Sequence, residues 1–170
     1  MSALSASKAH YDSLQKLAAK TAAETLRSYG INLSLLHYSG RVDGAIKTQW
    51  LERQVSWDWP AIARSNREFK SFCLAMWAPN DQLVGLALMT LSKQAVTLKF
   101  VEGRPSSDCT FKGKRILIAL EVAANYAQGA GVGEIRIHPL NDTLAHLYES
   151  VYGFEVVKER KSESYYRKRI

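Results

Sequence analysis

The stretch KGKRILIALEVAANYAQGAGVGEIRIHPLNDTLAHLYESVYGF, residues 112–154, decides the fold that the sequence predicts. Apolar residues recur at helical spacing in its first part and indicate a helix over Lys112–Gln128, which ends at Gly129. A short strand, Glu134–His138, and a second helix, Asp142–Val151, follow. This order predicts a helical crossover between two neighbouring parallel strands.

The first turn of the predicted helix is suited to an anion. Lys112, Lys114 and Arg115 supply three cationic side chains there. Unpaired backbone N–H groups and the positive end of the helix dipole add to their charge. The sequence therefore predicts a phosphate-binding turn at this place.

Three antiparallel strands are expected before this crossover. Two β runs, Phe69–Trp77 and Gln82–Leu91, are joined by the strong turn Ala78–Asp81 and form a hairpin. A third strand, Ala95–Glu102, alternates apolar and polar residues until Val101. The break in alternation predicts a bulge at the end of this strand.

The N-terminal residues predict mainly helices. The expected elements are helix Ser7–Tyr29, strand Ile31–Tyr38, helix Ala45–Val55 and a short helix from Pro60 to about Arg67. Asp58 is placed to cap the short helix, and Ser39–Gly44 is expected to be a turn or loop. Trp57 and Trp59 either pack in the core, as tryptophans usually do, or form an aromatic wall for a substrate.

Two closing strands, Phe154–Glu159 and Ser164–Ile170, complete the expected order. The prediction is an α/β fold with a mixed, mostly antiparallel twisted sheet flanked by helices. We expect a single domain over residues 1–170, with an N-terminal helical part (1–67) and a sheet core (69–170).

The composition is that of a globular protein, with 46% hydrophobic and 23% charged residues. Cys73 and Cys109 are too few for a disulfide framework, and no spacing of ligands suggests a metal site. The N-terminus lacks the pattern of a secretory signal, and the most apolar run, Leu83–Leu91, is too short to span a membrane. We expect a cytoplasmic protein without a membrane partner.

The formal net charge is +7, and much of the excess lies near the C-terminus. Six cations gather there: Lys158, Arg160, Lys161, Arg167, Lys168 and Arg169. Cations on edge strands prevent edge-to-edge pairing, which explains them without a ligand. A nucleic-acid partner is the alternative, although no binding motif supports it.

The order of elements, together with a few motifs, resembles the Gcn5-related N-acetyltransferase (GNAT) superfamily. The resemblance covers roughly Phe69–Ile170 and is carried by Phe111–Ile116, Asn141 and Leu147–Glu149 ahead of Gly153–Glu155. It implies acetyl-CoA as a co-substrate and the acetylation of a primary amine by direct transfer.

The resemblance also implies where acetyl-CoA would lie. Its acyl-pantetheine arm would lie between strands Ala95–Glu102 and Glu134–His138, where backbone N–H groups near Phe100 and Val101 would polarise the carbonyl. Its pyrophosphate would lie against four residues at the helix start: Lys112, Gly113, Lys114 and Arg115. The family pattern has glycines where this sequence has Arg115 and Leu117. The cations, with Arg115 as a fork, would compensate by charge.

By the same resemblance, Tyr148 would protonate the departing thiolate, although it also fits a structural role. Glu102 is the expected proton acceptor for the amine, with an exposed loop carboxylate as the alternative. His138 could serve as the base instead. Asn141 would bond the pantetheine arm, or it is a plain helix cap.

The acceptor amine is not specified, and it could belong to a small molecule or to a protein. Residues 1–67 would line its side of the site. Two alternatives stay open: an inactive GNAT-like binding or regulatory module, and a nucleic-acid-associated protein that uses the basic C-terminus. The resemblance also makes a homodimer reasonable.

Overall fold

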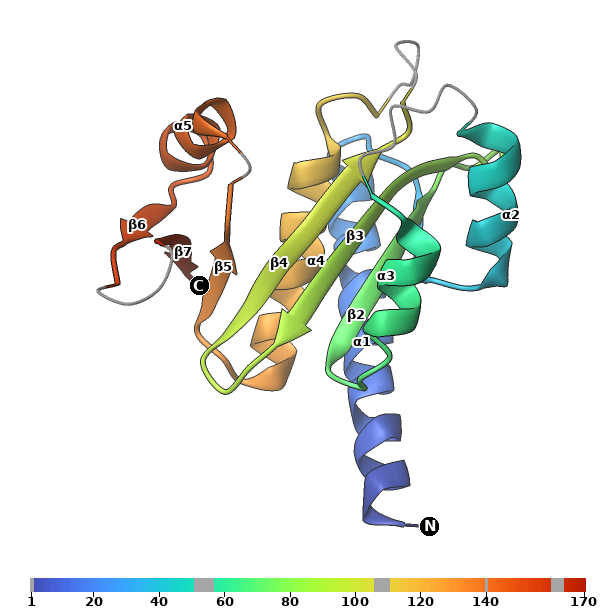
Figure 1. The fold of residues 1–170 in the computed structure, drawn as a ribbon, viewed down its shortest axis with the longest axis horizontal. Helices are drawn as coiled ribbons and strands as arrows, with labels where there is room; N and C mark the ends of the chain where they lie inside the picture. Colours follow the sequence, from blue (N-terminus) through green and yellow to red (C-terminus); the bar gives the residue numbers. More distant parts are fainter. Residues whose placement is uncertain (1, 51–56, 106–110, 140, 160–163) are drawn as a thin grey trace.

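The structure is a computed structural model that describes residues 2–50, 57–105, 111–139, 141–159 and 164–170. Within these residues, seven strands form one sheet in the order β1-β2-β3-β4-β5-β7-β6 (Figure 1). The strands are β1 Ser34–His37, β2 Ser71–Trp77, β3 Leu83–Leu91, β4 Ala95–Gly103, β5 Glu134–Ile137, β6 Glu155–Val157 and β7 Tyr165–Arg169. The helices are α1 Ala3–Ser28, α2 Gly40–Gln49, α3 Trp59–Ser65, α4 Arg115–Ala130 and α5 Asp142–Ser150.

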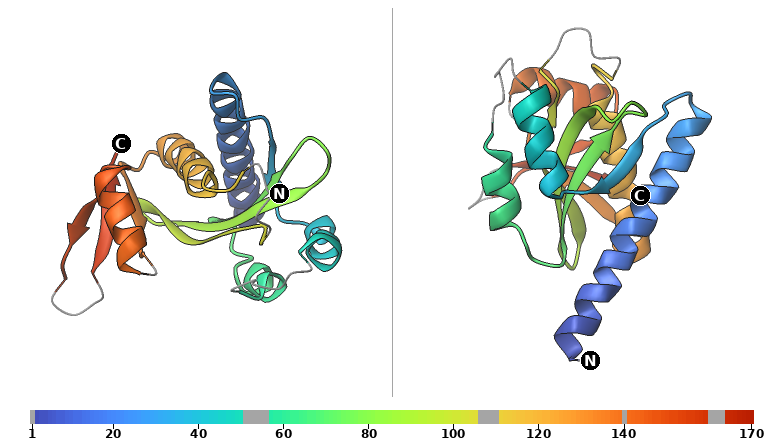
Figure 2. Two further views of the ribbon diagram at one scale, coloured as in Figure 1. Left: turned by 90° about the horizontal axis from the view of Figure 1, so that it is seen from above. Right: turned by 90° about the vertical axis from the view of Figure 1, so that its right-hand side faces the viewer.

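The predicted α/β architecture is confirmed. Neighbouring strands run antiparallel except for β4 and β5, which pair in parallel across the α4 crossover. Helices α1 and α4 cover one face of the sheet, and α2 and α3 cover the other (Figure 2). None of the described helices is long and apolar enough to cross a membrane.

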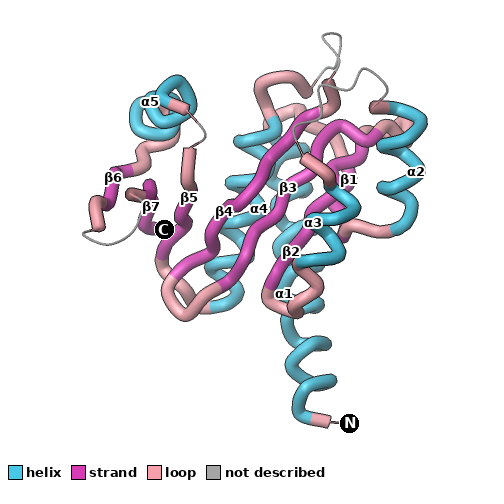
Figure 3. Tube along the Cα trace, viewed as in Figure 1, coloured by secondary structure: helices cyan, strands magenta, loops and turns pink. Residues whose placement is uncertain are grey.

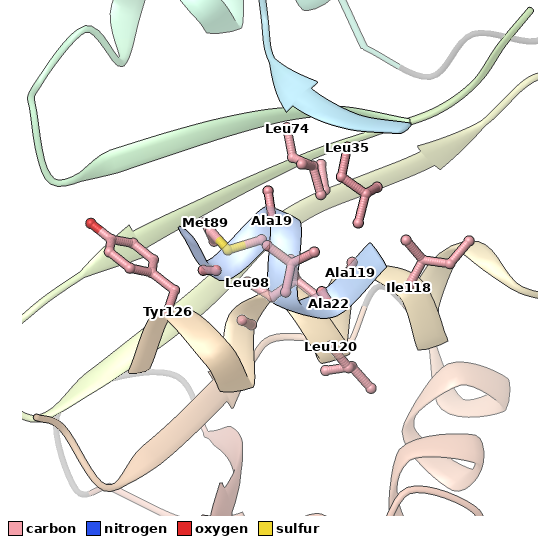
Figure 4. Packing of buried hydrophobic residues seen from close by; sticks show 14 of the residues in the cluster. Ala19, Ala22, Leu35, Leu74, Met89, Leu98, Ile118, Ala119, Leu120 and Tyr126 are labelled. Atoms are coloured by element: carbon pink, nitrogen blue, oxygen red, sulfur yellow. The ribbon is translucent and has the colours of Figure 1, made fainter. Parts of the chain in front are cut away.

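The larger core lies between the sheet and the two helices α1 and α4. Small side chains such as Ala19 and Ala22 of α1 and Ala119 of α4 are fully buried there (Figure 4). Alanine leaves room for two helices to approach closely, so α1 packs against α4 through its second half, where its buried residues lie. Gly129 stays within α4, and a Cβ at this position would lie 3.5 Å from the Leu14 side chain of α1.

One polar residue, Gln15, joins α1 to the sheet inside this core. Its side chain is 3% exposed, and its amide nitrogen donates to the Phe69 carbonyl at 2.9 Å and to the Tyr126 hydroxyl at 3.1 Å. Its amide oxygen accepts from Nε2 of His37 at 2.8 Å. Burial lowers the pKa of His37 against the opposing effect of the Asp12 carboxylate, so the ring is neutral at pH 7.

Replacing Gln15 with leucine should therefore leave several polar groups without a hydrogen-bond partner. We expect the free energy of unfolding to fall by about 1–3 kcal/mol, the usual cost of a buried polar group that loses its partner. Urea denaturation measures the loss. The matched control is Gln128→Leu on the exposed side of α4. Equal stability of the two variants would contradict a bridging role for Gln15.

The structure corrects the position of the β-bulge. The β3–β4 register shifts between Leu88, which faces Phe100, and Met89, which faces Leu98. Lys99 is therefore the extra residue, two positions before the expected break at Val101. The bulge reverses the alternation inside the strand rather than at its end, so Leu98 faces the larger core while Phe100 packs on the α3 side.

The crossover helix is shifted along the chain relative to its prediction. It begins at Arg115 because Phe111–Lys114 form a turn, in which Gly113 has a φ of +82°. It ends at Ala130, where Gly131 takes the left-handed conformation expected of a helix stop. The expected stop at Gly129 is thus wrong, and the true stop lies two residues further on.

The other corrected element is the segment Ser39–Gly44, expected as a turn or loop. Helix α2 already begins at Gly40, since burial of Val42 and Ala45 outweighs the low helix propensity of its glycines. The predicted continuation over 51–55 lies outside the described residues. The cap of α3 is confirmed, because the Asp58 side chain accepts from the Ala61 N–H.

Candidate active site

A narrow cleft opens where β4 and β5 separate. The two strands pair only from Ala95 to Leu98 on β4, and they diverge beyond this point (Figure 3). The resulting cavity has a volume of about 60 Å³ and is closed by the first turn of α4 and by α5. Phe100, Val101 and Tyr148 line it. The structure therefore brings together three residues that the sequence predicted for one site.

Tyr148, the predicted proton donor, lies in the wall of this cleft. Its side chain is 6% exposed and packs edge-on against Phe154 at 5.6 Å between ring centroids. Burial raises its pKa to about 12. Its hydroxyl makes no hydrogen bond to any residue that the structure describes. A protonated, unengaged phenol in a cleft is well suited to donate a proton.

Glu102 lies elsewhere. Its side chain is 9% exposed and its Oε1 accepts from the Trp59 indole N–H at 2.7 Å, on the face covered by α3. It does not line the cleft with Tyr148. Its role as proton acceptor stays a prediction, and the structure gives it a contact that holds α3 to β4.

His138, the alternative base, does line the cleft. It follows β5 directly, opposite the diverging part of β4, and its ring lies 6.2 Å from that of Tyr165. Of the two candidate bases, His138 is thus the one that shares a cavity with Tyr148.

The sequence left open whether Trp57 and Trp59 pack in the core or form an aromatic wall for a substrate, and the structure places the two residues differently. Trp59 is 1% exposed and belongs to the core of the α3 side. Trp57 is half-buried, lies edge-on to Phe100 at 5.1 Å, and forms one wall of the cleft. Core packing is thus confirmed for Trp59, while Trp57 packs beside the same core and its contact with a substrate stays a prediction.

The predicted phosphate turn presents Lys112, Gly113 and Lys114 to solvent at the start of α4. Asn141 caps α5, since its side chain accepts from the Leu144 N–H at 2.9 Å. A hydrogen bond from Asn141 to a pantetheine arm stays a prediction, as do the phosphate contacts of the two lysines.

Arg115, the predicted fork on phosphate, makes contacts within the protein. Its side chain runs back toward the ends of β3 and β4, and its Nε donates to the Val84 carbonyl at 3.0 Å. Facing glycines at 85 and 103 make room for it, because a Cβ on Gly103 would lie 2.6 Å from its guanidinium carbon. Its role as a fork on phosphate stays a prediction, and the structure gives it a contact at the strand ends.

Sequence reasoning missed this contact, although a signal was present. Glycines weaken strand interiors and often mark the close approach of another group. Gly85 and Gly103 lie directly opposite each other in the β3–β4 register. Such a pair predicts a large side chain crossing the sheet at that point.

Replacing Arg115 with glutamine should lower stability rather than ligand affinity alone. We expect a loss of about 1–3 kcal/mol, since the Val84 carbonyl loses a charge-assisted donor. Lys112→Gln, on the exposed turn, is the matched control and should change stability by less than about 0.5 kcal/mol. Urea denaturation of both variants gives the comparison. A stable Arg115→Gln protein would refute the structural role.

Comparison with known proteins identifies the class of fold. No protein-family model matches the sequence, and no curated protein sequence matches it. Solved structures do match, and the chain has the fold of the Gcn5-related N-acetyltransferases.

Three of these structures are each matched at a TM-score of 0.56. A GNAT-family acetyltransferase from Staphylococcus aureus Mu50 is 12% identical, over 81% of this chain and 98% of that chain. One from Listeria monocytogenes is 16% identical, over 83% and 96%. The ribosomal-protein-S18-alanine N-acetyltransferase of Escherichia coli is 14% identical, over 79% and 90%.

Proposed function

We propose that the protein is an acyl-CoA-dependent N-acetyltransferase that moves an acetyl group from acetyl-CoA to a primary amine by direct transfer. The observation that carries this proposal is the cleft between β4 and β5 with the unengaged hydroxyl of Tyr148 in its wall. The shared fold supports it. The amine would belong to a small molecule or a protein, and the protein would act in the cytoplasm.

The residues of the cleft fit the chemistry of acetyl transfer. The amine nitrogen forms a bond to the thioester carbon as the carbon–sulfur bond breaks. Tyr148 would give its proton to the thiolate, and His138 or Glu102 would take the proton that the amine loses. That proton returns to Tyr148 through solvent. Backbone N–H groups near Phe100 and Val101 would stabilise the developing oxyanion.

The phosphates of acetyl-CoA would lie against the turn before α4. Lys112 and Lys114 are exposed there and can supply the positive charge. Gly113, in the left-handed conformation, has open space where a Cβ would be, so the backbone can approach a ligand closely.

A second candidate function is a GNAT-like binding module without activity. Two side chains favour it, since Arg115 and Leu117 occupy the positions where the family pattern has glycines. A side chain at such a position takes the space that a phosphate would use. This candidate predicts no measurable affinity for acetyl-CoA. A third candidate is a nucleic-acid-binding protein that uses the exposed Lys168 and Arg169, and it makes the same prediction.

Calorimetric titration with acetyl-CoA separates these functions. We expect saturable binding by the wild type and weaker binding by Lys112→Glu, which reverses a charge at the turn. Lys93→Glu, on the exposed β3–β4 turn, is the control and should bind like the wild type. Binding would justify a screen of amines with released thiol as the readout. The absence of any heat of binding at millimolar acetyl-CoA would contradict the acetyltransferase proposal.

A further inference from the structure

The cleft between β4 and β5 is small and mostly apolar. Its volume is about 60 Å³, which leaves room for only a few heavy atoms. Among the described residues that line it, all except Lys99, His138 and Tyr148 are apolar or aromatic. Apolar walls favour a hydrocarbon group over a polar one, because a polar group would lose its hydrogen bonds to water there. The cleft therefore fits a short hydrocarbon group.

The floor of the cleft belongs to the core of the protein. Leu98 and Ile137 form the last pair of the parallel β4–β5 ladder, and they are only 4% and 2% exposed. Leu98 packs in the larger core with residues of α1 and α4 (Figure 4). Close-packed cores resist the insertion of additional carbon atoms. A group that enters between the two strands is therefore stopped at this pair.

Trp57 forms a side wall of the cleft, and other aromatic rings hold it in position. Its ring lies edge-on to Phe100 at 5.1 Å and to Trp59 at 6.2 Å between ring centroids. Trp59 is fixed in turn by its burial and by its hydrogen bond to Glu102. Edge-on aromatic pairs are favourable beyond the area that they bury. The cleft is thus narrowed by a bulky indole whose position is set by its neighbours.

We propose that the cleft selects short acyl groups, acetyl and propionyl, and that Trp57 sets the limit on their length. The proposal rests on the acetyltransferase function above, and it specifies which acyl-CoA thioesters the protein accepts. A longer chain would have to displace the indole or press on the core. Overpacking of this kind should weaken binding by about fivefold to 150-fold. Trp57 is only half-buried, so it is the wall that a substitution can remove without opening the core.

Calorimetric titration with CoA, acetyl-CoA, butyryl-CoA and hexanoyl-CoA tests the proposal without an acceptor amine. The affinity of each thioester is divided by that of CoA, so that the contribution of the acyl group is isolated. We expect the wild type to bind hexanoyl-CoA at least about tenfold more weakly than acetyl-CoA. For Trp57→Ala we expect this order to reverse, because each methylene buried in the vacated space strengthens binding by up to about fourfold.

Two further variants serve as controls. Ile46 is half-buried beside the same core but does not line the cleft, so Ile46→Ala should keep the selectivity of the wild type. Trp57→Phe keeps a smaller aromatic wall, and it should accept butyryl-CoA while it still discriminates against hexanoyl-CoA. This conservative variant also protects the test if Trp57→Ala does not fold, which the affinity for CoA itself would reveal.

The outcomes separate this inference from the proposed function. Equal relative affinities of the wild type for all three thioesters would overturn the selection of short acyl groups and leave the acetyltransferase proposal standing. Unchanged selectivity in Trp57→Ala and Trp57→Phe would overturn the role of Trp57. A wild type that binds neither CoA nor any thioester would contradict the acetyltransferase proposal, and the inference would fall with it.

Discussion

Replacing Tyr148 with phenylalanine is expected to lower kcat by about 10²-fold or more, the usual contribution of a general acid. The change removes only the hydroxyl, which lies in the cleft without a hydrogen bond to any described residue. The ring contacts with Phe154 and Tyr152 remain. The affinity for acetyl-CoA and the Tm should therefore stay close to wild type. Thiol release with a competent amine measures the effect.

The pH dependence of this reaction should also show the state of Tyr148. Because burial raises its pKa to about 12, the phenol keeps its proton through the range in which amines lose theirs. The rate should not fall through loss of this proton below about pH 10, the ordinary pKa of tyrosine. The stability of the fold should depend on pH in the same direction. The raised pKa of Tyr148 stabilises the folded state below about pH 10, and this contribution is lost as the pH rises toward 12.

The matched control is Tyr152→Phe. Tyr152 packs beside Tyr148 at 6.1 Å between ring centroids but does not line the cleft. Its variant should keep the wild-type kcat. Equal activity of Tyr148→Phe and the wild type would show that the proton for the thiolate comes from another group.

Replacing Trp59 with alanine is expected to lower the free energy of unfolding by about 3–5 kcal/mol, the cost of removing a large aromatic side chain from a core. Trp59 is almost completely buried and lies edge-on to Phe100 at 6.4 Å. It also donates to the buried Glu102 carboxylate. The substitution removes the packing and the donor together. Urea denaturation followed by circular dichroism measures the change.

Two variants separate the contributions of packing and hydrogen bonding. Trp57→Ala is the control for the loss of an indole, and it should cost less because Trp57 is only half-buried. Trp59→Phe keeps most of the packing and removes the indole N–H, so it should cost about 1.5–3 kcal/mol for a bond to a charged group. Equal losses for Trp57→Ala and Trp59→Ala would contradict the assigned packing.

Local signals predicted much of the fold. Asp58 and Asn141 were expected as helix caps, and both side chains accept from backbone N–H groups in the structure. Caps depend on a few consecutive residues, so the sequence contains the whole signal. The start of α2 was missed because its glycines disfavour a helix and the burial of Val42 is a tertiary effect.

The candidate site was predicted in part. Tyr148, Phe100 and Val101 share the cleft, because strand order and a helix between strands fix which residues meet. The direction of the Arg115 side chain could not be predicted from its charge, since that direction depends on the space above two facing glycines. The face of the sheet on which Glu102 lies depends on the bulge at Lys99. The sequence predicted this bulge two residues later, from the break in alternation at Val101.

The packing of α1 against α4 has a consequence for how the chain folds. Helix α1 is made before β1 to β4, and these strands must follow before α4 exists to cover it. Its alanine-rich face stays exposed for most of translation, and the contact joins distant parts of the chain. We therefore expect slow folding with a high contact order, and a nascent protein that is prone to aggregate until α4 has left the ribosome.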